Sequence, residues 1–444
     1  MMPKTAPAAR TAAAAVPARA RLAMAAALAL LGAWPMAAGA QAVDSALPAL
    51  LARAVPNDPQ VRIAQTLLQA SDERRKQARS RLAPNLAVNL TRAESAVTET
   101  GILSSNDFNR QQQRADAALR WNLYNAGNDI AELNASGRDL TAAEQDLRRA
   151  REESAERIAE AYLDLLRIDD LMPRTRTRLQ SVQRLVALVK KQNDAGKVSD
   201  ADLQQARAYL LDAEIASDQL ESERASARQK LARLSGEDVR DPRPVVMPAA
   251  SGSEVGLTGA QSAAEWRAKA ARERVRPLAT LAAPRIDFEL RKTLSDNTTP
   301  QVSSLEHRAW ALTARWDLAL GGETVARRNE TERRAEAAEA DVERLARGNR
   351  AELDALLPRL DSAERSVARL DGQIDQYKSL IRAGELQFEA GRRTLAQLIQ
   401  LHDSLYTAEQ HRSDQAYRLQ AGQLRRLSLT GNLLPALLGA QAGS

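Results

Sequence analysis

An internal repeat at a fixed offset of 195 residues constrains this chain more than any other feature. The residues that return at this offset are Trp121-Asn122-Leu123 as Trp316-Asp317-Leu318, Ala195-Gly196 as Ala390-Gly391, and Leu234-Ser235-Gly236 as Leu429-Thr430-Gly431. Because every pair has the same offset, no net insertion separates the two copies. A repeat of this kind is one supersecondary unit that the chain uses twice.

The first forty residues are a candidate targeting segment. Basic residues, an apolar run and small residues follow in that order: Lys4, Arg10, Arg19 and Arg21, then 22–34, then Ala38-Gly39-Ala40. This order predicts a secretory signal peptide over residues 1–40, whose apolar run is too short to span a membrane. Because it holds four basic and no acidic residues, its removal lowers the formal net charge from +6 to +2. The basicity that would favour nucleic acid is then mostly gone, so we expect no nucleic-acid partner.

The composition points away from a thick globular core. The chain has no cysteine, three Phe and six Tyr among its 444 residues. An exported chain without cysteine forms no disulfide and offers no thiol for a lipid anchor after the cleavage site. Alanine, leucine, arginine, glutamate and glutamine dominate, which is typical of long helices.

Apolar residues recur at helical spacing along most of the chain. Residues 43–82 are expected to be helical, with an interruption at Asn57-Asp58-Pro59, where the aspartate is the expected N-cap. Residues 128–194 and 323–389 are nearly free of glycine, and such a helix extends about 100 Å at 1.5 Å per residue. Their narrow apolar stripes are flanked by charge, which is the pattern of coiled-coil packing.

Each long helix is expected to end in a tight turn and to be followed by a returning helix. Gly196 and Gly391 stop the first helix of each copy, because glycine adopts the backbone conformation that ends helices. Ser199 and Thr394 are the expected N-caps of the returning helices. Each copy therefore contains a long helical hairpin.

Each copy also contains two stretches with the two-residue period of a β-strand. Apolar and polar residues alternate over 86–90 and 115–123 in the first copy, and over 286–290 and 310–318 in the second. The intervals, around Gly101–Asp107 and Asn297–Pro300, are expected to be polar loops. Such strands most often form an antiparallel sheet packed on a soluble core. A sheet between lipid and a water-filled channel has the same pattern, and it needs no such core.

These patterns divide the chain into five segments. They are a signal peptide (1–40), a first repeat (41–240), a linker rich in proline and glycine (241–260), a second repeat (261–431) and a C-terminal tail (432–444). A short helix over 263–282 is expected to lead into the second strand pair. The tail is apolar but short, so we expect it to pack locally or fray.

Residues for catalysis are not apparent in the sequence. It contains no P-loop, zinc-protease or nucleophile-elbow motif. Its histidines are His307, His402 and His411, of which the last two are nine residues apart on one helix. Nine residues are two and a half turns, which places the two rings on opposite sides of the helix and disfavours a metal site. We therefore expect no metal, no cofactor and no enzymatic activity.

With these motifs in order, the sequence resembles the TolC-like outer-membrane efflux proteins of Gram-negative bacteria. The residues that carry the resemblance are Asn57-Asp58-Pro59, Trp121-Asn122-Leu123-Tyr124 with Gly127, Tyr162-Leu163-Asp164-Leu165-Leu166, the turn from Asn193 to Leu203, and Phe388-Glu389-Ala390-Gly391-Arg392-Arg393-Thr394. Together with the duplication they cover nearly the whole mature chain.

The resemblance implies a mainly α fold with a small β part, in which each repeat is a strand pair plus a long helical hairpin. It implies a homotrimer whose strands close one β-barrel in the lipid of the outer membrane, continuous with an α-barrel in the periplasm. It also implies a passive exit duct for a tripartite efflux pump or a type I secretion system. The implied partners are a periplasmic adaptor (membrane fusion) protein and an inner-membrane pump of the ABC or RND type, and the cargo stays open.

The resemblance further implies roles for individual residues. The gate candidates are Asp202, Arg393, Phe388, Gln397 and Gln400. The expected adaptor contacts at the hairpin tips are Gly196, Val198, Ser199, Gly391, Arg392 and Thr394. The expected barrel-interface aromatics are Trp121, Tyr124, Phe288, Trp310 and Trp316. Asp202 and Arg393 match the family's linked pair, whereas Phe388 lacks the hydroxyl of the family's usual tyrosine. Gln397 and Gln400 stand where some members carry pore aspartates.

A periplasmic coiled-coil adaptor or scaffold is the alternative function. An adaptor would need a single hairpin between two halves of a β-rich body, and a scaffold would need no strands. This chain has two hairpins and two strand pairs, which favours the channel.

Overall fold

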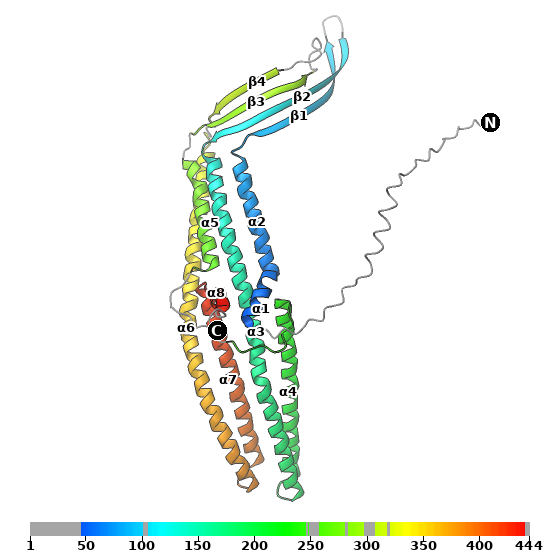
Figure 1. Ribbon diagram of the computed structural model, residues 1–444, viewed down its shortest axis with the longest axis vertical. Coiled ribbons are helices and arrows are strands. Elements are labelled where there is room, and N and C mark those ends of the chain that lie inside the picture. Colours follow the sequence, from blue (N-terminus) through cyan, green and yellow to red (C-terminus); the bar gives the residue numbers. More distant parts are fainter. Residues whose placement is uncertain are drawn as a thin grey trace, which may run out of the picture. The chain divides into compact units, whose positions relative to one another are not determined.

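The computed structural model describes residues 46–100, 105–245, 247, 257–279, 283–296, 307–317 and 320–439. The chain divides into two units, Met1–Ala42 and Val43–Ser444, and all described residues belong to the second. The predicted signal peptide therefore lies outside the described residues. Within the second unit the strands lie at one end of the long helices and the hairpin turns at the other (Figure 1).

The unit begins with a helix that is interrupted where the sequence predicts. It comprises α1 (Leu47–Ala54), a 3-10 turn (Val55–Asn57) and α2 (Pro59–Ser80). Asp58 caps α2, because its Oδ1 accepts a hydrogen bond from the Gln60 N–H at 2.6 Å. Pro59 takes the first helical position, where its missing N–H has no consequence.

The two long hairpins have the predicted bounds. The first consists of α3 (Asn128–Asp194) and α4 (Asp200–Ser235), and the second of α6 (Glu323–Glu389) and α7 (Leu395–Leu429). Both α3 and α6 contain 67 residues, so the duplication preserves helix length to the residue. Equal lengths place the two turns at the same distance from the strands.

The four strands form one antiparallel sheet in the order β1-β2-β3-β4. They are β1 (Asn85–Thr100), β2 (Ser105–Asn125), β3 (Arg285–Asp296) and β4 (His307–Arg315). Pairing between β2 and β3 joins the strand pair of the first repeat to that of the second. The register between them shifts at Ala115/Asp116 and at Asn122/Tyr124.

Two strand predictions need correction. Backbone pairing between β1 and β2 continues to Thr100↔Ser105, so the loop predicted over Gly101–Asp107 is wrong for Ser105–Asp107. Residues 92–114 are mostly polar in sequence, so a two-residue period of apolar residues could not reveal the strands there. In the second copy β4 ends at Arg315, so Trp316 follows the strand instead of belonging to it. Arg315 pairs with Arg285, the first residue of β3, and beyond it no partner strand continues.

The segment between the repeats also differs from the prediction. Helix α5 (Gly259–Val275) starts and ends earlier than the predicted 263–282, and a 3-10 turn (Arg276–Ala279) follows it. Pro277 explains the early end, because proline cannot donate the helical hydrogen bond. Gly259 permits the early start: a Cβ at this position would lie 2.8 Å from the Arg149 backbone nitrogen of α3.

Helix α3 lies at the centre of the helical part. It packs against α2, α4, α5 and α7, whereas α6 packs against α5 and α7 (Figure 1). A central apolar cluster surrounds the middle of α3, and its fully buried members include Tyr162, Leu165, Leu231, Leu424 and Leu433. Leu433 belongs to α8 (Leu433–Gly439), so this part of the tail packs locally as expected.

A second apolar cluster fills the space near the hairpin turns. This tip cluster contains Val182, Leu185, Val189, Leu203, Ala206, Tyr209, Ala213, Phe388, Leu395 and Leu398. None of the helices in the described part of the chain contains a stretch long and apolar enough to cross a membrane.

Candidate functional site

One face of the sheet carries apolar side chains in register across all four strands. Leu86 pairs with Leu119, Leu119 with Leu290, and Leu290 with Trp310. Alternate residues of a strand share a face, so this row lies on one side of the sheet. Leu86 is 66% exposed and Trp310 is 72% exposed, although both are apolar. An exposed apolar surface of this extent marks contact with lipid or with another protein.

The opposite face of the sheet is charged. Arg120 and Glu289 are register partners, and their side chains approach to 3.7 Å. Glu289 also pairs with Arg291 at 2.7 Å, and Arg285 pairs with Asp287 at 3.3 Å. Charged side chains of both signs at partly exposed positions require water. The sheet therefore has one apolar face and one charged face, as the alternation predicted.

The predicted interface aromatics all lie in or directly after β2, β3 and β4. Trp121 pairs with Phe288 across the β2–β3 seam. The Trp121 Nε1–H also donates to the Leu82 carbonyl at 3.0 Å, which links the sheet to the end of α2. Tyr124, Trp310 and Trp316 are exposed. A ring with an apolar body and a polar tip suits a membrane–water boundary.

The two outer strands have unsatisfied edges in the described chain. In the sheet order, β1 pairs only with β2, and β4 pairs only with β3. An open edge presents a row of unpaired N–H and C=O groups, which lipid cannot satisfy. The sheet of one chain is therefore incomplete as a membrane-spanning structure.

The two hairpin turns are built in the same way. Gly196 and Gly391 have φ of +72° and +69°, a conformation that favours glycine. Ser199 caps α4 in a capping box with Asp202: the Asp202 N–H donates to Ser199 Oγ at 3.2 Å, and the Ser199 N–H donates to Asp202 Oδ2 at 3.1 Å. Thr394 caps α7 with Gln397 in the same reciprocal arrangement, with both bonds at 3.3 Å.

The remaining tip candidates lie close to these caps. The Val198 carbonyl accepts a hydrogen bond from Asn193 Nδ2 at 3.2 Å, and Arg392 is exposed. Phe388 is buried in the tip cluster, and Gln400 is exposed on α7.

The predicted gate pair is not joined within one chain. Arg393 Nη1 donates to Gln387 Oε1 at 3.4 Å, and the Asp202 carboxylate serves the α4 cap. No bond between Arg393 and Asp202 occurs among the described residues. A link between them would therefore have to form between chains.

A polar cluster just above the tip cluster was not anticipated from the sequence. Asp403 Oδ1 accepts hydrogen bonds from Arg178 Nη2 at 3.1 Å and from the Tyr209 hydroxyl at 2.9 Å. The Arg178 guanidinium lies 4.4 Å from the centroid of the Tyr406 ring, a cation–π contact. Burial, followed by the negative charge of Asp403, raises the pKa of Tyr209, so its hydroxyl keeps the proton that it donates.

The cluster joins three helices that are far apart in sequence, namely α3, α4 and α7. No motif could reveal it, because Arg178 and Asp403 are 225 residues apart. The only available signal is the presence of Tyr209 and Tyr406 in helices of a chain that has six tyrosines in total.

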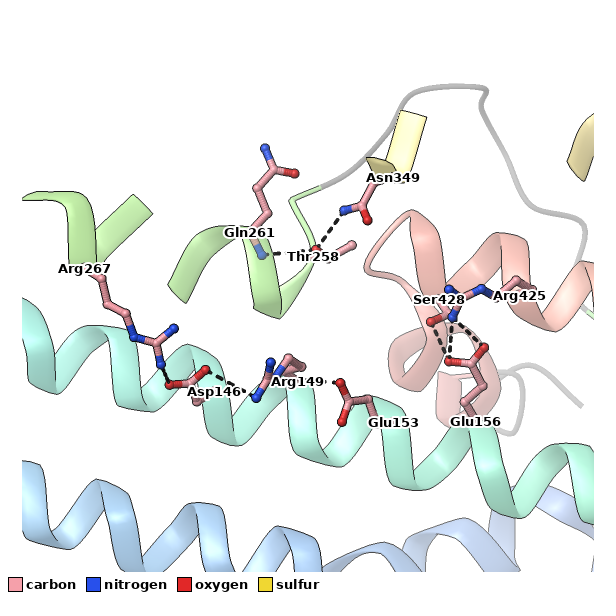
Figure 2. A network of polar contacts seen from close by, with 10 residues as sticks. All are labelled: Asp146, Arg149, Glu153, Glu156, Thr258, Gln261, Arg267, Asn349, Arg425 and Ser428. Atoms are coloured by element: carbon pink, nitrogen blue, oxygen red, sulfur yellow. Dashed lines mark hydrogen bonds and ion pairs between the residues drawn. The ribbon is translucent and has the colours of Figure 1, made fainter. Parts of the chain in front are cut away.

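A second polar network holds the two repeats together in the middle of the helices. Arg425 of α7 pairs with Glu156 of α3 at 3.0 Å (Figure 2). It also pairs with Glu352 of α6 at 2.7 Å. Ser428 Oγ donates to Glu156 Oε2 at 2.8 Å. The hydrogen bond to Glu352 raises the pKa of Arg425 most strongly, against the effect of burial. Arg425 therefore bridges α3 and α6, the first helices of the two hairpins.

The Asn-Asp-Pro motif has a structural role beyond capping α2. Asp58 Oδ2 accepts hydrogen bonds from Ser154 Oγ at 2.6 Å and from Arg157 Nη2 at 3.0 Å, both on α3. Burial raises the pKa of Asp58, but the bonds from Ser154, the Gln60 N–H and Arg157 together outweigh it, so the net pKa is lowered. The carboxylate is charged at neutral pH, and it fastens α2 to the centre of α3.

No group of three or more potential metal-ligating side chains is found in the described ranges. Of the two histidines considered above, His402 is buried and His411 is exposed.

Solved structures with the same fold are outer-membrane channels. The outer-membrane channel OprN has a TM-score of 0.79 at 20% identity, covering 88% of this chain and 91% of that chain. CusC, whose structures concern folding and transmembrane channel formation, has a TM-score of 0.78 at 17% identity, covering 88% and 92%. VceC of Vibrio cholerae has a TM-score of 0.76 at 19% identity, covering 88% and 96%. The fold is that of outer-membrane channel proteins.

The sequence comparison identifies the family. Residues 50–237, which make up most of the first repeat, match the family model described as outer membrane efflux protein. The first repeat of the chain is thus similar to outer membrane efflux proteins. No curated protein matches it. The predicted resemblance to TolC-like efflux proteins is confirmed, and so is the predicted localisation in the outer membrane, with the helical part in the periplasm.

Proposed function

We propose that three copies of this chain form one exit duct of a tripartite efflux pump. Four strands from each copy would close a single barrel in the outer membrane, and the long helices would continue it as a tube in the periplasm. The duct is passive: a periplasmic adaptor docks at the hairpin tips, and an inner-membrane pump supplies the energy.

The open sheet edges carry this proposal. Lipid cannot pair the outer edges of β1 and β4, and closure with neighbouring copies satisfies both at once. The exposed apolar row from Leu86 to Trp310 would then face lipid, and the charged face with Arg120 and Glu289 would face the water-filled lumen.

The helical part supports the same assembly. Helices α4 and α6 each expose large apolar side chains in the described chain: Leu211 and Ile215 on α4, and Leu380 and Leu386 on α6. Contact of α4 in one copy with α6 in the next would bury both sets. Such a head-to-tail contact generates a ring when the rotation closes.

The hairpin tips are the proposed gate and adaptor-docking site. Asp202 and Arg393 have no bond to each other within one chain, although both lie at the tips, and a link between copies would hold the tube closed. Adaptor contact with the exposed turns would shift the tube toward an open state. Phe388 would support the gate through packing. Gln397 and Gln400 are uncharged, so the tip would lack the ring of aspartates that some family members carry.

The assembly is tested on protein extracted from the outer-membrane fraction in detergent. Light scattering should give three times the mass of one chain, and planar bilayers should show discrete conductance steps. Leu211→Glu should reduce the trimer to smaller species, whereas Leu211→Met, which keeps an apolar side chain, should not. A periplasmic monomer or dimer without conductance would contradict the proposal and leave a scaffold.

The identity of the cargo distinguishes drug efflux from type I secretion. Loss of the protein should increase sensitivity to small toxic compounds if it serves drug efflux. A failure to export one particular protein, with unchanged sensitivity, would indicate type I secretion instead.

A further inference from the structure

A cavity of about 720 Å³ lies between α3, α6 and α7, just above the tip cluster. Its size falls in the range of small-molecule sites, which usually enclose several hundred Å³. It lies within one chain and needs no neighbouring copy, so what it binds can be considered apart from the proposed assembly.

The lining of this cavity carries more positive than negative charge. Five arginine and lysine side chains and three glutamates contribute to it. Among the described residues, Arg184, Lys378 and Arg382 have no acidic partner within ion-pair distance. Arg174 and Arg178 pair with Asp170 and Asp403, so three cationic side chains of the lining remain available to an anion.

Two buried nitrogen atoms in the lining have no hydrogen-bond partner. His402 is 6% exposed, and its Nε2 is unpaired; the nearest acidic atom, Glu385 Oε1, is 3.9 Å away, beyond hydrogen-bond distance. The Arg178 Nε–H is also unpaired, although the side chain is only 12% exposed. Unpaired buried donors are costly, and their usual explanation is a missing ligand or water.

His402 can act as a neutral donor at this site. Burial lowers its pKa most strongly; Asp403 raises it, and the nearby charges of Arg178 and Arg184 lower it further. A neutral imidazole carries one N–H, which an anionic oxygen can accept.

The rest of the lining is apolar. Leu185 and Leu188 of α3, Ile381 of α6, and Leu405 and Tyr406 of α7 contribute to the walls. A purely inorganic anion would leave these side chains without a contact, whereas an organic anion would cover them. Hydrophobic walls with a few convergent polar groups are typical of small-molecule sites.

We propose that the cavity between α3, α6 and α7 binds a small amphipathic organic anion, a carboxylate or sulfonate on an apolar ring system. The acidic group accepts hydrogen bonds from His402 Nε2 and Arg178 Nε, and Lys378 and Arg382 supply charge at the rim. The apolar body lies against Leu185, Ile381 and Tyr406. Neither the gate nor the adaptor site contains these groups.

The test is equilibrium dialysis of the full-length mature protein in lipid nanodiscs against 1-naphthoate, with 1-naphthamide as the neutral isostere. Naphthoate should bind saturably at one site per chain, and naphthamide should bind at least tenfold more weakly. Equal binding of the two probes, or no saturable binding of naphthoate, would overturn the proposal.

Substitutions locate the site. Lys378→Gln with Arg382→Gln alters two exposed side chains that support no buried contact, and it should weaken naphthoate binding about tenfold or more. Arg365 is an exposed arginine earlier in α6, outside the cavity lining, so Arg365→Gln should leave binding unchanged. Unchanged binding in the double variant would place naphthoate elsewhere and refute the assignment.

The histidine is tested by two replacements. His402→Gln keeps a side-chain donor and should retain most of the affinity, whereas His402→Leu should lose it. If an acidic peptide of alternating aspartate and glutamate displaces naphthoate at equal concentration, the ligand is a protein segment and the small-molecule proposal fails.

Discussion

The two long helices α3 and α6 have the same length and the same position in the repeat, but they differ in how much of their surface the chain buries. The buried residues of α3 extend along the helix from Ala131 to Val189, whereas those of α6 are few and scattered, from Ala335 to Phe388. The difference follows from the neighbours, because α3 packs against α2, α4, α5 and α7, whereas α6 packs against α5 and α7. Duplication has preserved the backbone and let the two surfaces diverge.

The comparison of α3 with α6 distinguishes side chains that stabilise the single chain from those that are available for contact with another copy. Leu185 on α3 and Leu380 on α6 occupy the same position in the repeat, 195 residues apart. Leu185 is 5% exposed and Leu380 is 48% exposed. The exposed member contributes its apolar surface only when another chain covers it.

The largest expected effect comes from truncating this matched pair. Leu185→Ala should lower the free energy of unfolding by about 2–5 kcal/mol, because it leaves a cavity in the tip cluster. Leu380→Ala should leave the unfolding of the isolated chain nearly unchanged and reduce only the stability that depends on protein concentration. Urea unfolding followed by circular dichroism at two protein concentrations distinguishes the two. Equal losses at both positions would mean that the two helices do not differ as described.

The bridge at Arg425 gives the next largest effect. Arg425→Gln removes the charged partner of Glu156, whose side chain is 12% exposed, and should lower the stability by about 1–3 kcal/mol. Lys230, at the same position of the first repeat, is exposed, and Lys230→Gln should change stability by less than about 0.5 kcal/mol. Thermal unfolding measures both. A similar fall for the two variants would show that Arg425 does not tie the repeats together.

The N-caps of α2 and α5 should differ in their response to pH. The folded pKa of Asp58 is lowered, so its contribution is fully present above the unfolded value of about 4 and is lost as pH falls through the folded value. Asp58→Asn should therefore reduce the loss of stability between pH 6 and pH 3, by about 1 kcal/mol. Thr258→Ala removes the uncharged cap of α5 and should cost the same at both pH values. The melting temperatures of the three proteins at the two pH values decide the matter, and a steeper pH dependence in Asp58→Asn would refute the assignment.

The smallest energetic effect concerns the tips. Asp202 and Gln397 are the same cap position of the two repeats, so Asp202→Gln should keep the capping box and the stability while removing the charge. If the proposed gate link exists, this variant and Arg393→Ala should both raise single-channel conductance, although the link contributes under about 1 kcal/mol. Asp202→Ala, which also loses the cap, serves as the comparison for stability. Unchanged conductance in Asp202→Gln would assign Asp202 to capping alone.

The sequence predicted the helical part well because local signals define it. Glycines at the turns, caps at Ser199 and Thr394, and the scarcity of glycine within the helices determine where α3 and α6 end. The outer part of the sheet was missed because its sequence is mostly polar, and only the backbone pairing between β1 and β2 reveals it.

The site was less predictable than the fold. The sequence identified the tip residues through their resemblance to a family, and their roles stay predictions. Contacts such as Arg178 with Asp403, or Arg425 with Glu156, join residues more than two hundred positions apart and follow no pattern within either repeat. Two helices that each look ordinary alone acquire these contacts only when they meet.

The contacts between α3 and α7 also bear on how the chain folds during its synthesis. Its contacts, such as Arg167 with Asp414 and Ser413 with Asp170, join residues that are 247 and 243 positions apart. During synthesis α3 is complete long before α7 exists, an interval of roughly tens of seconds at ordinary rates of elongation. Throughout this interval the first repeat exposes the surface that α7 will cover.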